Sequence, residues 1–260
     1  MSYNIAVAGK GGSGKTTVAC LVIRYLKKNN KGPILAIDAD SNANLGESLG
    51  LDSQDTIGHI LSEFQGDKIN IPSGMTKQVY LEYKLNETVV ESSGLDLITM
   101  GRGEGQECYC YPNLILRKFV DGLADNYAYT VLDNEAGMEH LSRGTTQNID
   151  ELLIVSNYSI KGIRAIDRIK ELVSELGLRV KRQSYIITQA PPKLDPAIIG
   201  ELNRLKIEPT AIIPFDENIP DYDFKLKSLL ELPDDSETVK AVNELMDKLL
   251  KSNKEIHAQT

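Results

Sequence analysis

Short apolar runs rich in β-branched residues recur along the whole chain. Most of them lack the apolar and polar alternation of a strand with one face in water, so we expect strands buried on both faces, as in a parallel sheet. The runs are Ile5–Ala8, Ile34–Ile37, Leu95–Met100, Tyr129–Leu132, Leu152–Val155, Tyr185–Thr188 and Ala211–Pro214.

Several segments between these runs carry apolar residues at helical spacing. They are Thr16–Lys28, Leu114–Leu123 and Ile163–Leu176. Strands that alternate with crossover helices predict an α/β fold, a doubly wound and mostly parallel sheet flanked by helices. Residues 66–91 have mixed periodicity and receive no assignment. The sequence shows no internal repeat, low-complexity tract or flexible linker, so we expect residues 1–260 to form a single domain.

The segment Ser236–Ser252 has the periodicity of an amphipathic helix. An amphipathic membrane anchor has a basic polar face. Between Ser236 and Glu255, however, four lysines are balanced by four acidic residues. We therefore expect this helix to pack on the sheet.

Charge and composition narrow the possible partners. The chain has 29 basic and 37 acidic residues and a formal charge of −8, which repels phosphate backbones and anionic lipids. We therefore expect no nucleic-acid and no membrane partner. The N-terminus lacks the pattern of a signal peptide, no apolar run approaches the roughly 20 residues of a membrane span, and only three cysteines occur. These features predict a cytoplasmic protein in a reducing compartment.

A phosphate-binding motif follows the first predicted strand. Its residues are Gly9, Lys10, Gly11, Gly12, Ser13, Gly14, Lys15, Thr16 and Thr17, which match G-x-x-x-x-G-K-[ST]. The glycines let backbone N–H groups surround a phosphate, and Lys15 neutralises the β- and γ-phosphate oxygens. Thr16 supplies a hydroxyl ligand for Mg²⁺. The motif predicts a nucleotide-binding site.

Carboxylates end two other predicted strands. Asp133 follows the run Tyr129–Leu132, and Asp38 and Asp40 follow the run Ile34–Ile37. Alternate positions of an extended chain face the same way, so Asp38 and Asp40 can point together toward bound phosphates. Such residues hold Mg²⁺ directly or through water.

The pattern K-G-G-x-G-K-T-T, with a second lysine at Lys10, resembles the deviant Walker A motif of the SIMIBI ATPases. That group includes the MinD/ParA, nitrogenase iron protein, arsenical-pump ATPase and CooC types. The resemblance implies Mg²⁺-dependent ATP hydrolysis in a homodimer, with Lys10 reaching the partner's nucleotide. It also implies that Asp40 orients the attacking water, that Asp38 and Asp133 lie near Mg²⁺, and that Pro214 belongs to the nucleotide site. The family's adenine-reading Asn is replaced here by Thr188-Gln189, and adenine remains the expected base.

A pair of cysteines lies in a glycine-rich segment, Cys108-Tyr109-Cys110. In an extended loop both sulfurs face one side and can share a soft metal ion, and a two-fold dimer completes four ligands. Thiolates suit Ni²⁺, Zn²⁺ or Cu⁺. The pair resembles that of CooC-type ATPases, which insert nickel into carbon monoxide dehydrogenase or acetyl-CoA synthase. We expect Cys20 to be a core residue, and His140 to be hydrogen-bonded rather than a metal ligand.

The leading hypothesis is an ATP-dependent metallochaperone that binds Ni²⁺, or Zn²⁺ at the same cysteines, and delivers nickel to a client enzyme such as carbon monoxide dehydrogenase. One alternative is a MinD/ParA-like positioning ATPase, which would need a basic surface for DNA or lipid. Another is an iron–sulfur reductase like the nitrogenase iron protein, which needs a cysteine close after the aspartate equivalent to Asp133. The segment Asn134-Glu135-Ala136-Gly137 contains none.

Overall fold

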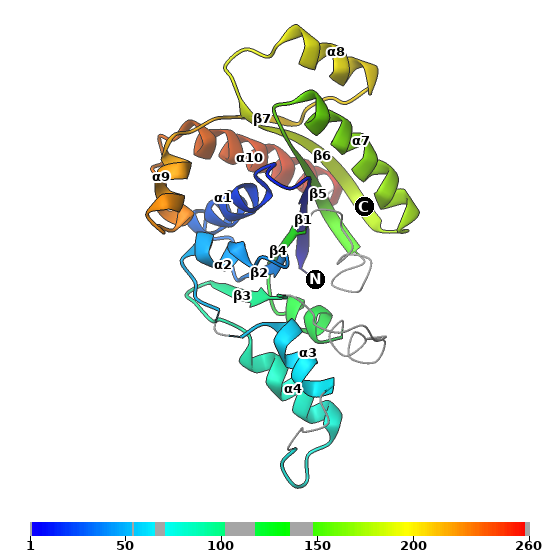
Figure 1. Cartoon of the computed structure of the whole chain (residues 1–260), viewed down its shortest axis with the longest axis vertical. Coiled ribbons are helices and arrows are strands. Elements are labelled where there is room, and N and C mark those ends of the chain that lie inside the picture. The colour runs from blue at the N-terminus through cyan, green and yellow to red at the C-terminus, as the bar shows by residue number, and fades with distance from the viewer. Residues whose placement is uncertain (1, 54, 66–70, 102–117, 136–147, 258–260) are drawn as a thin grey trace.

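The computed structural model describes residues 2–53, 55–65, 71–101, 118–135 and 148–257. Within these residues, seven parallel strands form one sheet in the order β3-β2-β4-β1-β5-β6-β7 (Figure 1). This confirms the α/β fold and the parallel sheet predicted from the apolar runs. The strands are β1 (Tyr3–Gly9), β2 (Ile34–Ala39), β3 (Leu95–Thr99), β4 (Tyr129–Asn134), β5 (Asn148–Asn157), β6 (Arg179–Ala190) and β7 (Ala211–Pro214).

Successive residues of β1 pack into two different hydrophobic cores. Ile5 and Val7 belong to the core on one face of the sheet, and Ala6 and Ala8 belong to the core on the other. All four are at most 2% exposed. Full burial of a side chain as large as Ile contributes about 1.5–3 kcal/mol. Burial on both faces therefore explains why the strand sequences show no polar alternation.

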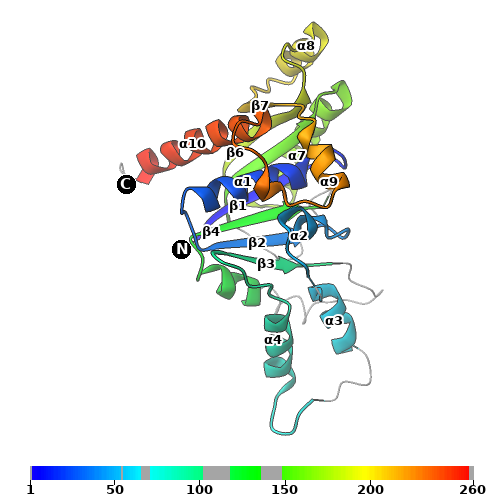
Figure 2. The same cartoon turned by 90° about the vertical axis from the view of Figure 1, so that its left-hand side faces the viewer.

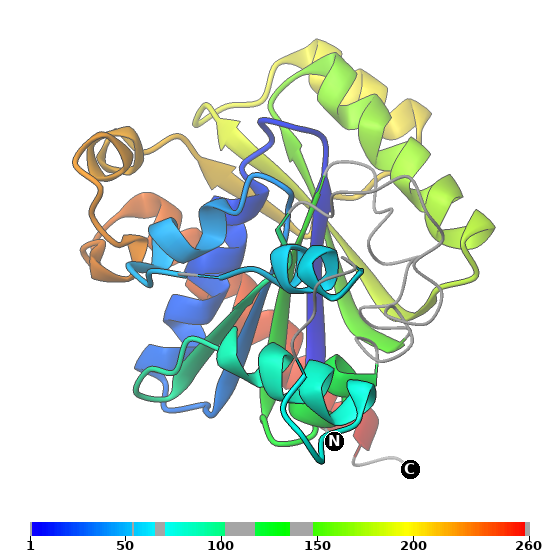
Figure 3. The same ribbon diagram turned by 60° about the horizontal axis from the view of Figure 1, so that its bottom comes forward.

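Helices cover both faces of the sheet (Figure 3). On the side of Ile5 and Val7 they are α1 (Lys15–Lys28), α2 (Asn44–Leu49), η1 (Leu229–Glu231) and α10 (Glu237–His257). On the side of Ala6 and Ala8 they are α3 (Ile57–Gln65), α4 (Lys77–Glu87), the helical residues 118–124, α7 (Ile160–Glu175) and α8 (Pro196–Arg204). Figure 2 shows α3 and α4 extending away from the β3 edge of the sheet.

The predicted helices Thr16–Lys28 and Ile163–Leu176 agree with α1 and α7 apart from their ends. Helix α7 begins at Ile160 rather than Ile163, because the Ser159 hydroxyl accepts a hydrogen bond from the backbone N–H of Gly162 and caps the helix. Helix α10 packs on α1 and β7, as expected for the C-terminal amphipathic segment.

Two further segments, 66–91 and Leu114–Leu123, also contain helical residues. Within the unassigned segment 66–91, α4 begins after Thr76, whose hydroxyl accepts from Val79 N–H. The predicted helix Leu114–Leu123 lies partly outside the described residues. No helix in the described ranges is both long enough and apolar enough to cross a membrane.

Candidate nucleotide site

The phosphate-binding loop leaves β1 at Gly9 and enters α1 at Lys15. A Cβ atom on Gly9 would lie 2.3 Å from the carbonyl oxygen of Val155 and 2.6 Å from the Ser13 hydroxyl, so only glycine fits. Gly14 precedes α1 with a left-handed φ of 82°, which glycine adopts at little cost. These two positions give the glycine spacing of the motif a steric reason.

The two lysines of the loop have opposite surroundings. Lys15 is 6% exposed within the loop, whereas Lys10 is exposed at the loop's outer side. Ser13 is buried, and its backbone N–H donates to the carbonyl oxygen of Lys10 at 3.1 Å. Lys15 is therefore placed to neutralise a phosphate bound in its own loop, and Lys10 is accessible from outside.

Strands β2 and β4 bring two carboxylates side by side. Asp38 and Asp133 are partners in the parallel register of these strands, so their side chains leave the same face of the sheet. Both are buried, at 0% and 1% exposure. The Asp38 carboxylate accepts hydrogen bonds from the backbone N–H of Leu45 at 2.8 Å and of Asp40 at 3.1 Å.

Asp133 has fewer hydrogen-bond partners than Asp38. Neither of its carboxylate oxygens makes a hydrogen bond of ordinary geometry to the described residues, although the Thr16 hydroxyl lies close enough to favour the charged form. A buried carboxylate without partners, beside a threonine hydroxyl and a second carboxylate, fits the oxygen ligands that Mg²⁺ prefers. Thr16, Asp38 and Asp133 are therefore the described residues that could hold the ion.

Burial also dominates the titration of this pair. The pKa of Asp133 is raised to about 7, mainly by burial and in smaller part by the neighbouring charge of Asp38, while Thr16 and Lys15 act to lower it. Burial likewise raises the pKa of Asp38 to about 6, against the two backbone hydrogen bonds that stabilise its charged form. Without a cation, the ionised forms of both carboxylates therefore destabilise the folded state.

Asp40 lies at the edge of this cluster and is half-buried. Its Oδ1 accepts from the backbone N–H of Asn42 at 2.9 Å and from the Asn42 side chain at 3.0 Å. Next to it, the Ser41 hydroxyl donates to Glu135 at 3.0 Å and joins the segment after β2 to the segment after β4. No local sequence pattern signals this contact, because the two residues are far apart in the chain.

An apolar pocket of about 90 Å³ opens beside the loop. Its lining comes from the start of α1, the ends of β6 and β7, α9 (Asn218–Phe224) and the first turn of α10. Pro214 contributes to it, and so do Thr188 and Gln189. A mostly apolar pocket next to a phosphate-binding loop has the character of a nucleoside subsite.

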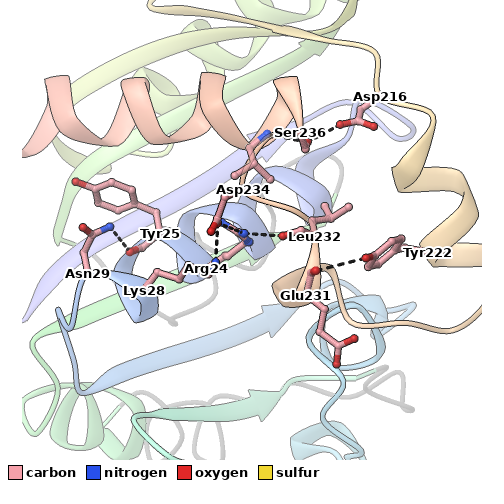
Figure 4. Close-up of polar contacts among 11 residues, drawn as sticks. Arg24, Tyr25, Lys28, Asn29, Asp216, Tyr222, Glu231, Leu232, Asp234 and Ser236 are labelled. Carbon is pink, nitrogen blue, oxygen red and sulfur yellow. Dashed lines mark hydrogen bonds and ion pairs between the residues drawn. The ribbon is translucent and has the colours of Figure 1, made fainter.

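The wall of this pocket is fixed by hydrogen bonds. Figure 4 shows the Ser236 hydroxyl beside Asp216, to which it donates. Asp216 also accepts from the backbone and side chain of Asn218. Burial acts to raise the pKa of Asp216, but these hydrogen bonds lower it below its ordinary value. The Thr238 hydroxyl donates to the carbonyl oxygen of Pro214 at 3.0 Å, so the start of α10 holds the end of β7.

The same C-terminal segment is bound to α1 by a buried arginine. Arg24, 2% exposed, donates to the carbonyl oxygen of Leu232 and to Asp234, both at 2.5 Å (Figure 4). Tyr25 donates to Asp247 of α10 at 2.5 Å. Because α1 starts at the phosphate-binding loop, these contacts connect the loop to the pocket wall. No sequence motif signals them.

Cys108 and Cys110, the predicted ligands of a soft metal ion, lie outside the described residues. So does His140, which we expect to be hydrogen-bonded rather than a metal ligand. Among the residues that are described, no group of three or more His, Cys, Asp and Glu side chains is arranged to hold a metal ion. Cys20 is fully buried in the core, as expected, and burial raises the pKa of its thiol strongly.

A family model described as an AAA domain, AAA_31, matches residues 3–183, more than half of the chain. The chain belongs to this family of P-loop ATPases. It is 39% identical, over 95% of its length and 98% of the relative's, to an uncharacterized ATP-binding protein of Methanocaldococcus jannaschii.

Other relatives of this AAA_31 chain have more specific names. It is 28% identical to the carbon monoxide dehydrogenase accessory protein CooC of Rhodospirillum rubrum, over 83% of this chain and 84% of that protein. The septum site-determining protein MinD of Pyrococcus horikoshii, solved with Mg-ADP, superposes with a TM-score of 0.68 at 18% identity and covers 96% of both chains. That superposition shows a shared fold.

Proposed function

We propose that this AAA_31 protein is an ATP-dependent metallochaperone that carries Ni²⁺ at a dimer interface and delivers it to a nickel enzyme such as carbon monoxide dehydrogenase. The observation that carries the proposal is the similarity to CooC over most of both chains, in a protein whose sequence contains Cys108-Tyr109-Cys110. The fold, which MinD-type proteins share, supports the ATPase but does not favour any cargo.

The ATPase reaction is assigned to the site described above. Lys15 and the loop N–H groups bind the phosphates, and Thr16, Asp38 and Asp133 would hold Mg²⁺, directly or through water, to neutralise charge on the phosphates. Asp40 orients a water that attacks the γ-phosphorus. The bond from that phosphorus to the β–γ bridging oxygen breaks, and ADP and phosphate are released.

Lys10 acts on the nucleotide of a second copy. Its side chain is exposed, whereas Lys15 is buried in the loop. A lysine that reaches across a homodimer places positive charge where the transition state of phosphoryl transfer is most negative. Hydrolysis then depends on dimer formation.

The metal step uses the same dimer. Two thiolates from Cys108 and Cys110 of each subunit make one four-sulfur site, which suits Ni²⁺ or Zn²⁺. ATP and metal then both favour the closed dimer, and hydrolysis opens it and releases the ion to the client. The two ligands are coupled through one association equilibrium.

Metal titration with mass determination tests this function. We expect one Ni²⁺ per dimer, with thiolate charge-transfer absorption that disappears in Cys108→Ser and Cys110→Ser. Cys20→Ala is the matched control, because a fully buried thiol with a raised pKa is a poor metal ligand. Unchanged nickel binding in both loop variants would refute the metal role.

A mixing experiment tests the trans role of Lys10. Lys10→Ala and Lys15→Ala should each be inactive alone, while their mixture regains up to about a quarter of wild-type hydrolysis, because half of the dimers are mixed and each has one complete site. No recovery on mixing would contradict the trans arrangement. ATP-dependent sedimentation with anionic vesicles or DNA, without nickel binding, would instead favour a positioning ATPase.

A further inference from the structure

Strands β2 and β4 end together beside the candidate nucleotide site. Ala39 and Asn134 are the last register partners of these two strands. Asn134 is 0% exposed, and its side-chain amide donates to the carbonyl oxygen of Val7 in β1 at 2.9 Å. This hydrogen bond ties the end of β4 to the strand that leads into the phosphate-binding loop. The segments after Ala39 and Asn134 therefore leave the sheet from adjacent points that the sheet holds in place.

The segment after β2 is a tight turn. The backbone N–H of Ala43 donates to the carbonyl oxygen of Asp40 at 3.0 Å, and Ala43 has a left-handed φ of 54°. Asp40 Oδ1 accepts from both the backbone and the side chain of Asn42. A carboxylate oxygen accepts about two hydrogen bonds, so Oδ1 is taken up by the turn and Oδ2 is the oxygen that can face a water molecule. The direction of Oδ2 therefore depends on how the whole turn is held.

A hydrogen bond between side chains joins this turn to the segment after β4. The Ser41 hydroxyl donates to Glu135 Oε1 at 3.0 Å. Both residues are half-buried, so water competes only in part with this hydrogen bond. Ser41 follows Asp40 directly, and Glu135 lies two residues after Asp133. The contact thus connects the residue assigned to the attacking water with a residue assigned to Mg²⁺.

We propose that Glu135 is a positioning residue for ATP hydrolysis, which holds the turn through Ser41 so that Asp40 faces the γ-phosphate. Glu135 acts as a hydrogen-bond acceptor, and neither as a base nor as a metal ligand. A displacement of about 1 Å at a reacting group can lower a rate about 100-fold, so loss of this hydrogen bond should affect turnover more than nucleotide binding. The inference rests on the proposed ATPase function and adds the residue that aligns its water-orienting aspartate.

Steady-state ATP hydrolysis, together with binding of a non-hydrolysable ATP analogue and Mg²⁺, tests the proposal. Ser41→Ala and Glu135→Ala should each lower kcat roughly 5- to 50-fold and change KM and the Kd of the analogue by less than about twofold. Unchanged analogue binding also shows that the variants are folded. Glu135→Gln keeps an acceptor and Ser41→Thr keeps the hydroxyl, so both should hydrolyse ATP within about threefold of wild type. The double variant Ser41→Ala/Glu135→Ala should be no slower than either single variant, because each removes the same hydrogen bond.

Glu91→Ala and Ser92→Ala are the controls and should keep wild-type turnover, because both residues precede the start of β3, at the opposite end of the sheet. Wild-type kcat in Ser41→Ala and Glu135→Ala would overturn the positioning role alone. A Glu135→Gln protein as slow as Glu135→Ala would show that Glu135 acts through its charge, and weaker analogue binding with unchanged kcat would show a role in binding; either result would also overturn it. A wild type that neither binds nor hydrolyses ATP would overturn the proposed ATPase itself.

Discussion

Replacing Asp133 by asparagine should stabilise the nucleotide-free protein at neutral pH. Asp133 is 1% exposed, and its pKa is raised from 3.8 to about 7, mainly by burial. The folded state therefore holds a proton that the unfolded chain releases. Protonated Asp133 leaves the full stability of the fold in place below about pH 4, and this advantage is lost as the pH rises through about 7. Above that pH the ionised carboxylate lowers the free energy of unfolding by about 4 kcal/mol.

The amide that Asp133→Asn introduces has its own burial cost of about 2 kcal/mol, because the carboxylate it replaces lacks hydrogen-bond partners in this site. The net gain expected for Asp133→Asn is thus about 2 kcal/mol at pH 7.5 and near zero at pH 5. A gain of this size corresponds to a rise in Tm of roughly 4–8 °C.

Urea unfolding followed by circular dichroism, at pH 5 and pH 7.5, measures this difference. Mg²⁺ with ATP should stabilise wild type and have a smaller effect on the variant, since the cation neutralises the carboxylate that the variant lacks. Asp52→Asn, at an exposed position, is the control. An Asp133→Asn protein that is less stable than wild type at pH 7.5, or a difference that does not change with pH, would refute the electrostatic reasoning.

Two further predictions concern steric fit and the C-terminal contacts. Gly9→Ala should destabilise the nucleotide-free protein by about 1–3 kcal/mol in urea unfolding, because the added Cβ meets Val155 and Ser13. Gly11→Ala is the control and should not destabilise it, because no atom lies within 4 Å of its Cβ. Equal stability of the two variants would contradict the packing argument. Arg24→Ala should lower the free energy of unfolding by about 2–3 kcal/mol in the same assay, and Asp234→Asn should lower it less, because Arg24 is buried and Asp234 is largely exposed. A larger effect at Asp234 would show that the ion pair, rather than the hydrogen bond to Leu232, binds the C-terminal segment to α1.

The strands and the position of the loop followed from local signals in the sequence. Buried strands leave apolar runs, and β7 has the bounds expected for Ala211–Pro214. The glycine spacing of the loop has the steric reasons found at Gly9 and Gly14. Such signals depend on residues next to one another in the chain, so they can be recognised in a single sequence.

The contacts that complete the site are not local. Ser41 meets Glu135, Thr188 meets Ser13, and Asp216 meets Ser236 only after the strands are ordered in the sheet. The αL conformation of Gln189 arises from the register shift between β6 and β7, which no residue type in that stretch signals. The roles of Lys10, Asp40 and the cysteine pair stay predictions from the sequence.

The charges of the site favour a mechanism in which the cation organises the loops. Asp38 accepts N–H groups from Asp40 and Leu45, so its carboxylate fixes the segment after β2, and Ser41 extends that segment to Glu135 after β4. The pKa values of Asp38 and Asp133 are raised mainly by burial, which disfavours the charged form of each carboxylate; at Asp133 the opposing effects of Thr16 and Lys15 do not offset it. A bound Mg²⁺ would favour the ionised form of both carboxylates, including that of Asp38, which accepts N–H groups from the segment after β2. We therefore expect Mg²⁺ binding to stabilise the segment after β2 through the ionised carboxylate of Asp38.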